Sequence, residues 1–199
     1  MHHIKDHFGT KSISIPANLT FEVDDIDDEW VFQRPFSFIH ARLMVFCMRD
    51  PISVFRKAFN SLEPGGYLEM QDASSPLRSL DGTIDGTALR EIYELMTSGA
   101  AKLGIDTSNP SRYKAMFEEV GFVDVTETVF ELPIGPWGKS KYHKKIGSLF
   151  RKDLDMGCEG MAMGMLTRIH GMQKEEVMKM VTQVKLDMAN RDVHAYQNL

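Results

Sequence analysis

A Pro-Gly-Gly turn between two apolar segments constrains the fold of this chain more than any other feature. Before it, Asp50-Pro51 has the residues of a helix N-cap and a first helical turn. Apolar side chains then recur with a helical period and make one face, consisting of Val54, Phe55, Ala58, Phe59 and Leu62. Pro64-Gly65-Gly66 cannot continue this helix, because proline lacks the amide hydrogen and glycine permits positive φ. We therefore predict a helix that starts at Pro51 and ends before this turn.

Two short apolar runs flank the predicted helix, and both are typical of strands. Phe36–His40 precedes the helix, and Tyr67–Gln71 follows the turn. A strand, a helix and a second strand in this order make a parallel crossover unit. Such units belong to open α/β sheets, so we predict an α/β fold.

The rest of the chain offers further strands and helices. Leu19–Val23 and Phe122–Phe130 are predicted strands, and Asp72–Gly86 is a predicted loop rich in Ser, Pro and Gly. Helices are predicted over Leu89–Ala100 with a stop at Gly104, from Asn109-Pro110 to Gly121, and from Ser140 onward with interruptions near Gly157-Cys158 and Gly171.

Composition fits one folded domain and excludes several classes of protein. The chain has 199 residues, 43% of them hydrophobic, which is enough for a sizeable core. Its net charge of −5 argues against a nucleic-acid binder, and the basic run Lys139–Lys145 is interpreted as a solvated helix face. Cys47 and Cys158 suggest no disulfide framework. Without a membrane-length apolar run or a signal peptide, we expect no membrane partner and a cytoplasmic or nuclear location.

An ordered set of motifs carries a family resemblance over nearly the whole chain. The motifs are Phe21-Glu22-Val23-Asp24-Asp25, Trp30, Phe38–Leu43, Phe59 with Leu62–Asp72, Val120-Gly121-Phe122, Leu132-Pro133 with Gly135-Pro136-Trp137, Gly160–Met163 with Leu166-Thr167-Arg168, and Val193-His194-Ala195-Tyr196. The chain resembles class I S-adenosylmethionine (SAM) methyltransferases, in particular a fungal group that includes a regulator of secondary metabolism. This resemblance implies a single domain over 1–199, with an α/β part at 17–135 and a helical part at 136–199 that faces substrate or partner.

The resemblance also implies which parts of the family pattern the sequence lacks. The family opens with a strand and a G-x-G-x-x-G turn that approaches the cofactor. Residues 1–16 contain one glycine, Gly9, and no such motif, and the chain stops at Leu199 soon after its His-Ala-Tyr motif. We therefore expect a partial Rossmann-like sheet that lacks the first strands, as in a family member truncated at both ends.

The resemblance assigns two groups of residues to SAM. Asp25, with Asp24 beside it, matches the acidic position that accepts a hydrogen bond from the adenine amino group. His40, Ala41 and Arg42 match the turn beside the methionine part, where Arg42 could meet the carboxylate. Ser37 stands where the family usually has Asp. The alternatives are a solvated acidic loop for Asp25 and a structural role for His40.

No spacing singles out a catalytic residue. Glu69, Asp72 and His143 could each act as a general base toward a hydroxyl acceptor. His2, His3 and His7 suggest a flexible terminus or a tag remnant rather than a metal site. Eight of the 14 methionines lie between Met156 and Met188, where they could fill a core, line a lipophilic pocket or form a partner surface.

Three functions remain open at this point. The first is SAM-dependent methyl transfer to a small molecule, such as a fungal secondary metabolite, with an incomplete SAM site. The second is a methyltransferase-like protein without SAM, either an enzyme of another kind or a regulator of a partner. The third is a truncated product without activity of its own. Unpaired sheet edges favour a homodimer or a heteromer with an intact methyltransferase.

Overall fold

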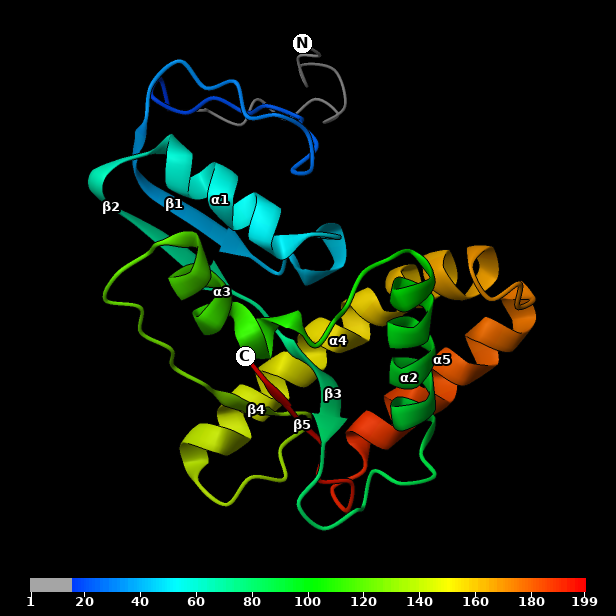
Figure 1. Cartoon of the computed structure of the whole chain (residues 1–199). Coiled ribbons are helices and arrows are strands. Elements are labelled where there is room, and N and C mark those ends of the chain that lie inside the picture. The colour runs from blue at the N-terminus through cyan, green and yellow to red at the C-terminus, as the bar shows by residue number, and fades with distance from the viewer. Residues whose placement is uncertain (1–15) are drawn as a thin grey trace.

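The computed structural model describes residues 16–199, so the predictions for His2, His3 and His7 lie outside the described residues (Figure 1). Its elements in chain order are β1 (Phe36–Arg42), the 3-10 helix η1 (Val45–Cys47), α1 (Pro51–Ser61), β2 (Leu62–Gln71), β3 (Ser74–Arg78), α2 (Ala88–Lys102), the 3-10 helix η2 (Asn109–Arg112), α3 (Tyr113–Val120), β4 (Glu131–Pro133), α4 (Lys141–Arg168), α5 (Lys174–Ala189) and β5 (Tyr196–Asn198).

The predicted crossover unit is confirmed. β1 and β2 are parallel neighbours, and α1 connects them. Asp50 caps α1, because its side chain accepts a hydrogen bond from the Ser53 amide at 3.1 Å. β2 reaches back to Leu62, but its regular pairing with β1 begins after the glycine turn, where Phe38 pairs with Tyr67. This parallel unit confirms the α/β class and supplies part of a Rossmann-like sheet.

The crossover unit has its own hydrophobic core. Phe55 of α1 is fully buried, and its ring meets the rings of Tyr113 and Phe117 on α3 at centroid distances of 5.0 and 4.5 Å. Leu68 and Met70 of β2 pack against the same cluster. α1 and α3 therefore cover one face of the two-stranded sheet, and we call this cluster the crossover core (Figure 1).

A second core lies among the remaining helices. Leu89 and Ile92 of α2, Leu166 of α4 and Val177 of α5 belong to one buried cluster, which we call the helical core. A three-stranded antiparallel sheet in the order β3-β5-β4 joins this region, so the chain's last strand lies between two earlier ones. Because α2 packs with α4 and α5, the helical core draws on residues from both sides of position 135.

Two of the predicted strands are wrong. Leu19–Val23 forms no strand, and its apolar side chains are exposed. Phe122–Phe130 is irregular and its Val123 is exposed; only Phe130 joins a ladder, by exchanging hydrogen bonds with Leu199. Both segments carry a strand-like pattern without a neighbouring strand to pair with. Conversely, the predicted loop Asp72–Gly86 contains β3.

The predicted helices are confirmed with different boundaries. Gly104 and Gly121 follow α2 and α3 with φ of 79° and 117°, as a glycine stop requires. The segment after Asn109 starts as η2 before it becomes α3. The interruption expected at Gly157-Cys158 is wrong, because α4 continues through it with Cys158 buried against the helical core. None of the helices in residues 16–199 is long and apolar enough to cross a membrane.

Candidate functional site

An oriented histidine lies on the face of the two-stranded sheet that no helix of residues 16–199 covers, which we call the uncovered face. Strand alternation places Phe38, His40 and Arg42 on this face, opposite the face that carries the crossover core. His40 Nδ1 lies 3.0 Å from Glu69 Oε2, and Gln71 Nε2 donates to Glu69 Oε1 at 2.8 Å. The hydrogen bonds from Gln71 and His40 lower the pKa of Glu69, so this carboxyl stays ionised. Glu69 can therefore fix the His40 ring and leave Nε2 directed at a ligand, as in a general base with its orienting carboxylate.

The turns that follow β1 and β2 are locked together by Asp72. This buried carboxylate accepts hydrogen bonds from the Val45 amide at 3.1 Å and from the Tyr113 hydroxyl at 3.2 Å. Burial raises the pKa of Asp72 and, together with the Asp72 charge, raises the pKa of Tyr113. Leu43 has a φ of 53° and donates its amide to Gln71 at 2.9 Å. Asp72 thus holds the carboxyl ends of both strands and is poorly placed to act as a base.

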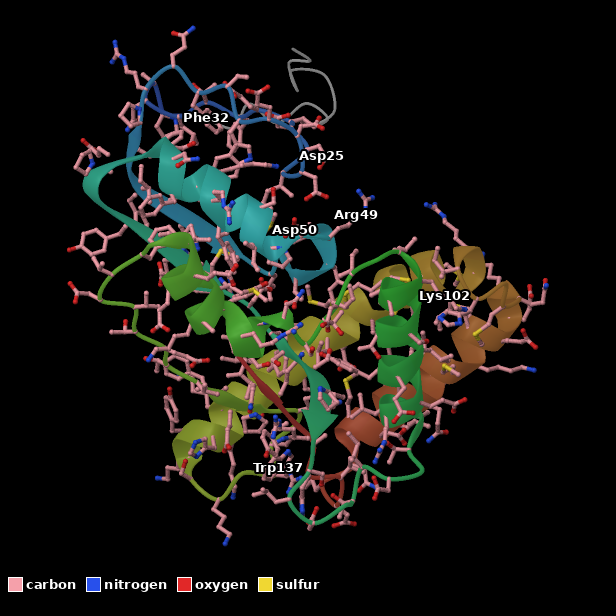
Figure 2. The ribbon with its side chains drawn as sticks, in the orientation of Figure 1. Asp25, Phe32, Arg49, Asp50, Lys102 and Trp137 are labelled. Carbon is pink, nitrogen blue, oxygen red and sulfur yellow. The ribbon has the colours of Figure 1, made fainter. Side chains whose placement is uncertain are left out.

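The acidic loop is tied to α1 through its backbone and one ion pair. Lys57 Nζ donates to the Asp27 carbonyl at 2.7 Å and the Ile26 carbonyl at 3.3 Å, and Arg49 pairs with Asp27 at 3.5 Å. Asp25 is exposed, and its Oδ1 accepts the Asp27 amide at 2.9 Å. Figure 2 shows Asp25 on this loop near Arg49 and Asp50, which lie at the start of α1. Because the chain reaches α1 from the carboxyl end of β1, the loop lies at that end of the sheet.

The structure brings some of the predicted cofactor residues together and leaves others apart. His40, Ala41 and Arg42 belong to β1 itself instead of following it, and His40 and Arg42 share the uncovered face. Ala41 points to the opposite, partly buried face, so only its backbone is available on the His40 side. Asp24 and Asp25 lie on the separate acidic loop, where Asp24 accepts the Asp25 amide at 3.0 Å. Within residues 16–199, no hydrogen bond joins the two groups.

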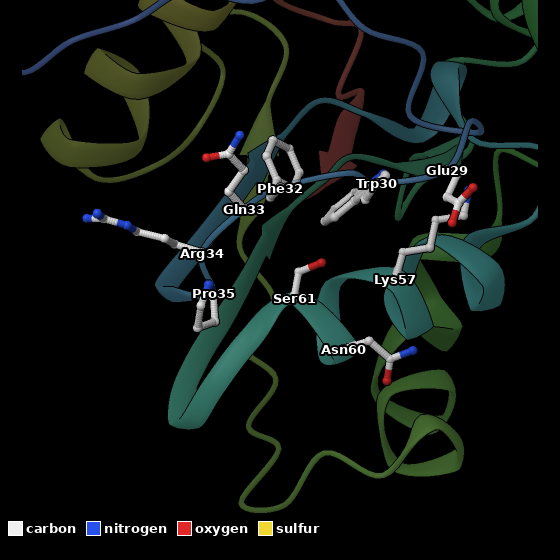
Figure 3. Close-up of a pocket in the computed structure, with 9 residues that line it drawn as sticks. All are labelled: Glu29, Trp30, Phe32, Gln33, Arg34, Pro35, Lys57, Asn60 and Ser61. Carbon is white, nitrogen blue, oxygen red and sulfur yellow. The ribbon is translucent and has the colours of Figure 1, made fainter.

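An aromatic hollow lies at the other end of the crossover unit. It has a volume of about 720 Å³ and opens between the segment 29–35 and the second half of α1 (Figure 3). Trp30 and Phe32 form part of its wall with an edge-to-face contact at 5.8 Å, and Ser61 directs its hydroxyl into it. None of the predicted cofactor residues lines this hollow. The Trp30 and Phe32 pair in the sequence is the signal that would have found it.

A second hollow runs along the edge of β2 that faces away from β1. It has a volume of about 540 Å³ and lies between β2, α3 and the segment 125–130. Glu69 and Gln71 line it together with Asp72 and Tyr113, and Arg78 and Lys114 add positive charge. Small-molecule sites have volumes of roughly 300–1,000 Å³. This hollow, which we call the edge hollow, therefore has room for a small ligand next to the His40–Glu69 pair.

The described part of the chain contains no cluster of side chains suited to bind a metal ion. No group of three or more His, Cys, Asp or Glu side chains in residues 16–199 is arranged to hold a metal ion. The remaining base candidate, His143, lies at the start of α4, where its Nδ1 is 2.8 Å from the Ser140 hydroxyl. It has no carboxylate partner among the described residues. The His40–Glu69 pair is thus the better oriented base.

The chain is similar to a methyltransferase-domain family and to fungal proteins that are named as methyltransferases. Residues 8–127 match the methyltransferase-domain family. The chain is 32% identical to methyltransferase pytC of Aspergillus terreus over 182 residues, which cover 90% of this chain and 56% of pytC. It is 28% identical over 188 residues to the probable methyltransferase tdiE of Emericella nidulans, covering 94% of the chain and 59% of tdiE. It is 22% identical over 187 residues to the protein-methionine methyltransferase laeA of the same fungus, covering 92% and 50%. The chain spans between half and three fifths of the length of these relatives.

Proposed function

Because the chain belongs to the methyltransferase-domain family, we propose that it transfers methyl groups from SAM to a small-molecule acceptor in fungal secondary metabolism. The observation that carries this proposal is the His40–Glu69 pair, which lies beside the edge hollow at the carboxyl ends of two parallel strands. Open α/β sheets bind their ligands at this end. The proposal extends to the location, which we expect to be the cytoplasm or the nucleus.

The residues present fit the chemistry of SAM. Asp25 is exposed, and one of its oxygens has no hydrogen-bond partner among the described residues, so it can accept from an adenine amino group. Arg42 is exposed on the His40 face and has no ion pair within residues 16–199, so it can bind a carboxylate in a bidentate manner. Asp24 and the Ala41 backbone complete the set. SAM supplies an electrophilic methyl group when bound.

Each nearby side chain then has a role that follows from its contacts. Nε2 of His40 accepts the proton of an acceptor hydroxyl, and Glu69 stabilises the imidazolium that results. Gln71 holds Glu69 in place from the neighbouring position on β2. The edge hollow takes the body of the acceptor. Its wall carries Arg78 and Lys114 beside the acidic Glu69, Asp72 and Glu127, so it suits a polar phenolic molecule rather than an anion. Positioning of the acceptor provides the rest of the rate.

An isotope-transfer assay tests this function. Methyl-labelled SAM and a panel of small phenols are incubated with the folded protein, and labelled products are separated. His40→Gln should lower product formation by about 10²–10⁴-fold, the usual contribution of a general base. His143→Gln is the matched control and should leave it unchanged, because His143 lacks a carboxylate partner in the described structure. Equal loss in both variants, or no effect of His40→Gln on a reaction that does occur, would remove His40 as the base.

A second candidate function is that of a partner subunit for an intact methyltransferase or for a second copy of this chain. Parallel sheets are normally covered on both faces. Here Phe38 and Tyr67 on the uncovered face are 53% and 73% exposed, and among the described residues β1 has a neighbour on one edge alone. Another chain could cover this face. Sizing of the purified protein, alone and mixed with pytC, would reveal such an assembly as a shift to larger mass.

A further inference from the structure

The outer face of α4 carries a regular pattern of largely apolar residues that no other element of residues 16–199 covers. Residues spaced alternately by four and three positions make one stripe along the helix, and they are Tyr142, Ile146, Leu149, Asp153, Met156 and Gly160. This spacing is that of a helix-packing seam, and it spans about 27 Å at 1.5 Å per residue. We call it the outward stripe.

The packing of α4 fixes the direction in which the outward stripe faces. Gly147 is buried, and a Cβ atom there would lie 2.0 Å from the Gly135 carbonyl oxygen, so the helix backbone presses directly on this segment. Cys158 and Ala162 lie on the same inner side in the helical core. Leu149 is two residues from Gly147, which at 3.6 residues per turn puts it about 200° around the helix. The stripe therefore faces away from the rest of the protein.

The large side chains of the stripe are exposed, as expected for a helix face that points away from the rest of the protein. Tyr142, Leu149 and Met156 are 66%, 58% and 74% exposed. They follow one another at intervals of seven residues, so they form a ridge and not a scatter of surface side chains. Large apolar side chains that line up in this way mark an interaction surface rather than an ordinary solvated face.

The charge beside the first half of the stripe is positive. Six basic residues and no acidic residue lie between positions 138 and 152, whereas the whole chain has a net charge of −5. These residues are Lys139, Lys141, Lys144, Lys145, Arg151 and Lys152. Among the described residues only Arg151 has a carboxylate partner, Asp155 at 3.5 Å. Lys145 and Lys152 flank the ridge in this half, whereas Asp153, Asp155 and Glu159 follow in the second half. A ligand therefore meets unpaired positive charge between Tyr142 and Lys152.

These observations select one kind of occupant. We propose that the outward stripe of α4 is a docking surface for an acidic amphipathic helix of another protein. The alternating spacing matches the apolar face of a helix, and glutamate or aspartate beside that face would pair with Lys145 and Lys152. Asp153 within the stripe would fix the register by pairing with a polar or basic residue of the partner, as single polar residues do in coiled coils.

Two other occupants fit less well. A second copy of this chain carries Lys145 and Lys152 with Glu159 alone on the same flank, so even an antiparallel copy would present fewer carboxylates than an acidic helix. An anionic membrane would have to accept the Asp153 carboxylate in the middle of the apolar stripe, next to Met156, at a cost in desolvation. A partner helix can pair with that carboxylate.

Two synthetic peptides test the proposal with the full chain. Both are 28 residues long with leucine at alternating spacings of three and four; one has glutamate at the flanking positions and the other has lysine there. Fluorescence anisotropy should show saturable binding of the glutamate peptide and at least tenfold weaker binding of the lysine peptide. Added salt should weaken the first. Equal binding of the two peptides, or none, would overturn the proposal.

Variants of the chain make the test specific to the stripe. The double variant Leu149→Ser, Met156→Gln should bind the glutamate peptide at least tenfold more weakly. Leu186→Ser on α5, where the side chain is similarly exposed, is the matched control and should bind normally. The double variant Lys145→Glu, Lys152→Glu should reverse the preference in favour of the lysine peptide, a gain that misfolding cannot mimic.

Three results would contradict the assignment. The first is a charge reversal that leaves the peptide preference unchanged. The second is a dimer of the chain in sedimentation that Leu149→Ser dissociates, which would assign the stripe to a second copy. The third is binding to phosphatidylserine vesicles that the Leu149→Ser, Met156→Gln variant loses while neither peptide binds, which would assign the stripe to a membrane.

Discussion

The crossover core and the helical core differ in how much of each is continuous in sequence. In the crossover core, β1, α1 and β2 follow one another along the chain, and α3 comes later to complete the packing around Phe55. The helical core joins distant residues: α2 meets α5, and the last strand, β5, lies between β3 and β4. The candidate methyl-transfer site lies on the first, and the outward stripe lies on the second. Local sequence signals mark the strand-helix-strand unit of the first region, whereas no unit of the second region is marked in this way.

The two regions also differ in what shifts the pKa of a carboxyl group: burial does so for Asp72 in the first, and hydrogen bonds do so for Asp81 in the second. In the crossover core, Asp72 is held by the neighbouring strand turn and by Tyr113, and burial is what changes its pKa. Beside the helical core, Asp81 is exposed and is held by hydrogen bonds from His194, Thr83 and Ser79. The bond to His194 ties the loop after β3 to the segment before β5. The pKa of Asp72 thus depends mainly on burial, whereas the pKa of Asp81 depends mainly on a hydrogen bond to a residue distant in sequence.

The largest expected effect comes from emptying the crossover core. Phe55→Ala removes a fully buried ring and should lower the free energy of unfolding by about 3–5 kcal/mol. If the two cores are separate cooperative units, hydrogen exchange should speed up in α1, α3 and β2 and remain slow in α5. Leu166→Ala, also fully buried, should give the mirror pattern. Faster exchange throughout the chain in both variants would mean a single cooperative unit.

A smaller loss of stability is expected from a substitution at the contact between α4 and the segment after β4. Gly147→Ala places a methyl group against the Gly135 carbonyl and should destabilise the protein by about 1–3 kcal/mol in denaturant unfolding. Gly164→Ala on the same helix is the control. Its added methyl group meets open space, so it should stabilise the helix by up to about 1 kcal/mol. Equal effects of the two substitutions would contradict the close contact at Gly147.

The next effect concerns the pH dependence of Asp72. Its pKa is raised in the folded state, so its contribution to stability is complete below the ordinary carboxyl pKa and is lost as the pH rises through the folded pKa. Asp72→Asn should remove that decline, because the amide keeps an acceptor without a charge. Urea midpoints of both proteins between about pH 4 and pH 7 measure this. A decline of the same size in the variant would assign it to another group.

The smallest effect concerns Asp81 and has the opposite sign. Hydrogen bonds, first that from His194, lower the pKa of Asp81, so its contribution is present above the ordinary carboxyl pKa and is lost as the pH falls. Asp81→Asn should flatten the acid side of the stability profile. The group is exposed, so a small shift of the thermal midpoint below about pH 4 is expected. No change in the acid limb would mean that the link to His194 does not stabilise the fold.

Sequence reasoning succeeded where the signals are local. Asp50-Pro51 and Pro64-Gly65-Gly66 marked the crossover helix and its end, and glycines with positive φ marked the ends of α2 and α3. It failed where a partner is needed. Leu19–Val23 and Phe122–Phe130 have strand patterns but form no strand, and only Phe130 of the second segment is hydrogen-bonded to a ladder. Ser74–Arg78, by contrast, pairs with residues 196–198, more than 100 positions away.

The same division holds for the candidate site. The position of His40, Ala41 and Arg42 near the end of a strand could be read from the sequence, and their roles toward SAM stay predictions, as do those of Asp24 and Asp25. The pairing of His40 with Glu69 follows from the register of β1 against β2, which no local signal contains. The burial of Asp72 likewise depends on Tyr113, which is 41 residues away.

Calorimetric titration of the folded chain with SAM shows whether the candidate site binds the cofactor. We expect saturable binding of one SAM, weakened by about 1–3 kcal/mol in Asp25→Ala and again in Arg42→Ala, because each removes a partner of a polar group of the ligand. Lys102→Ala, at the end of α2 and outside the crossover unit (Figure 2), should bind normally. A folded protein that gives no heat, or Asp25 and Arg42 variants that bind as the wild type does, would contradict the proposed SAM site.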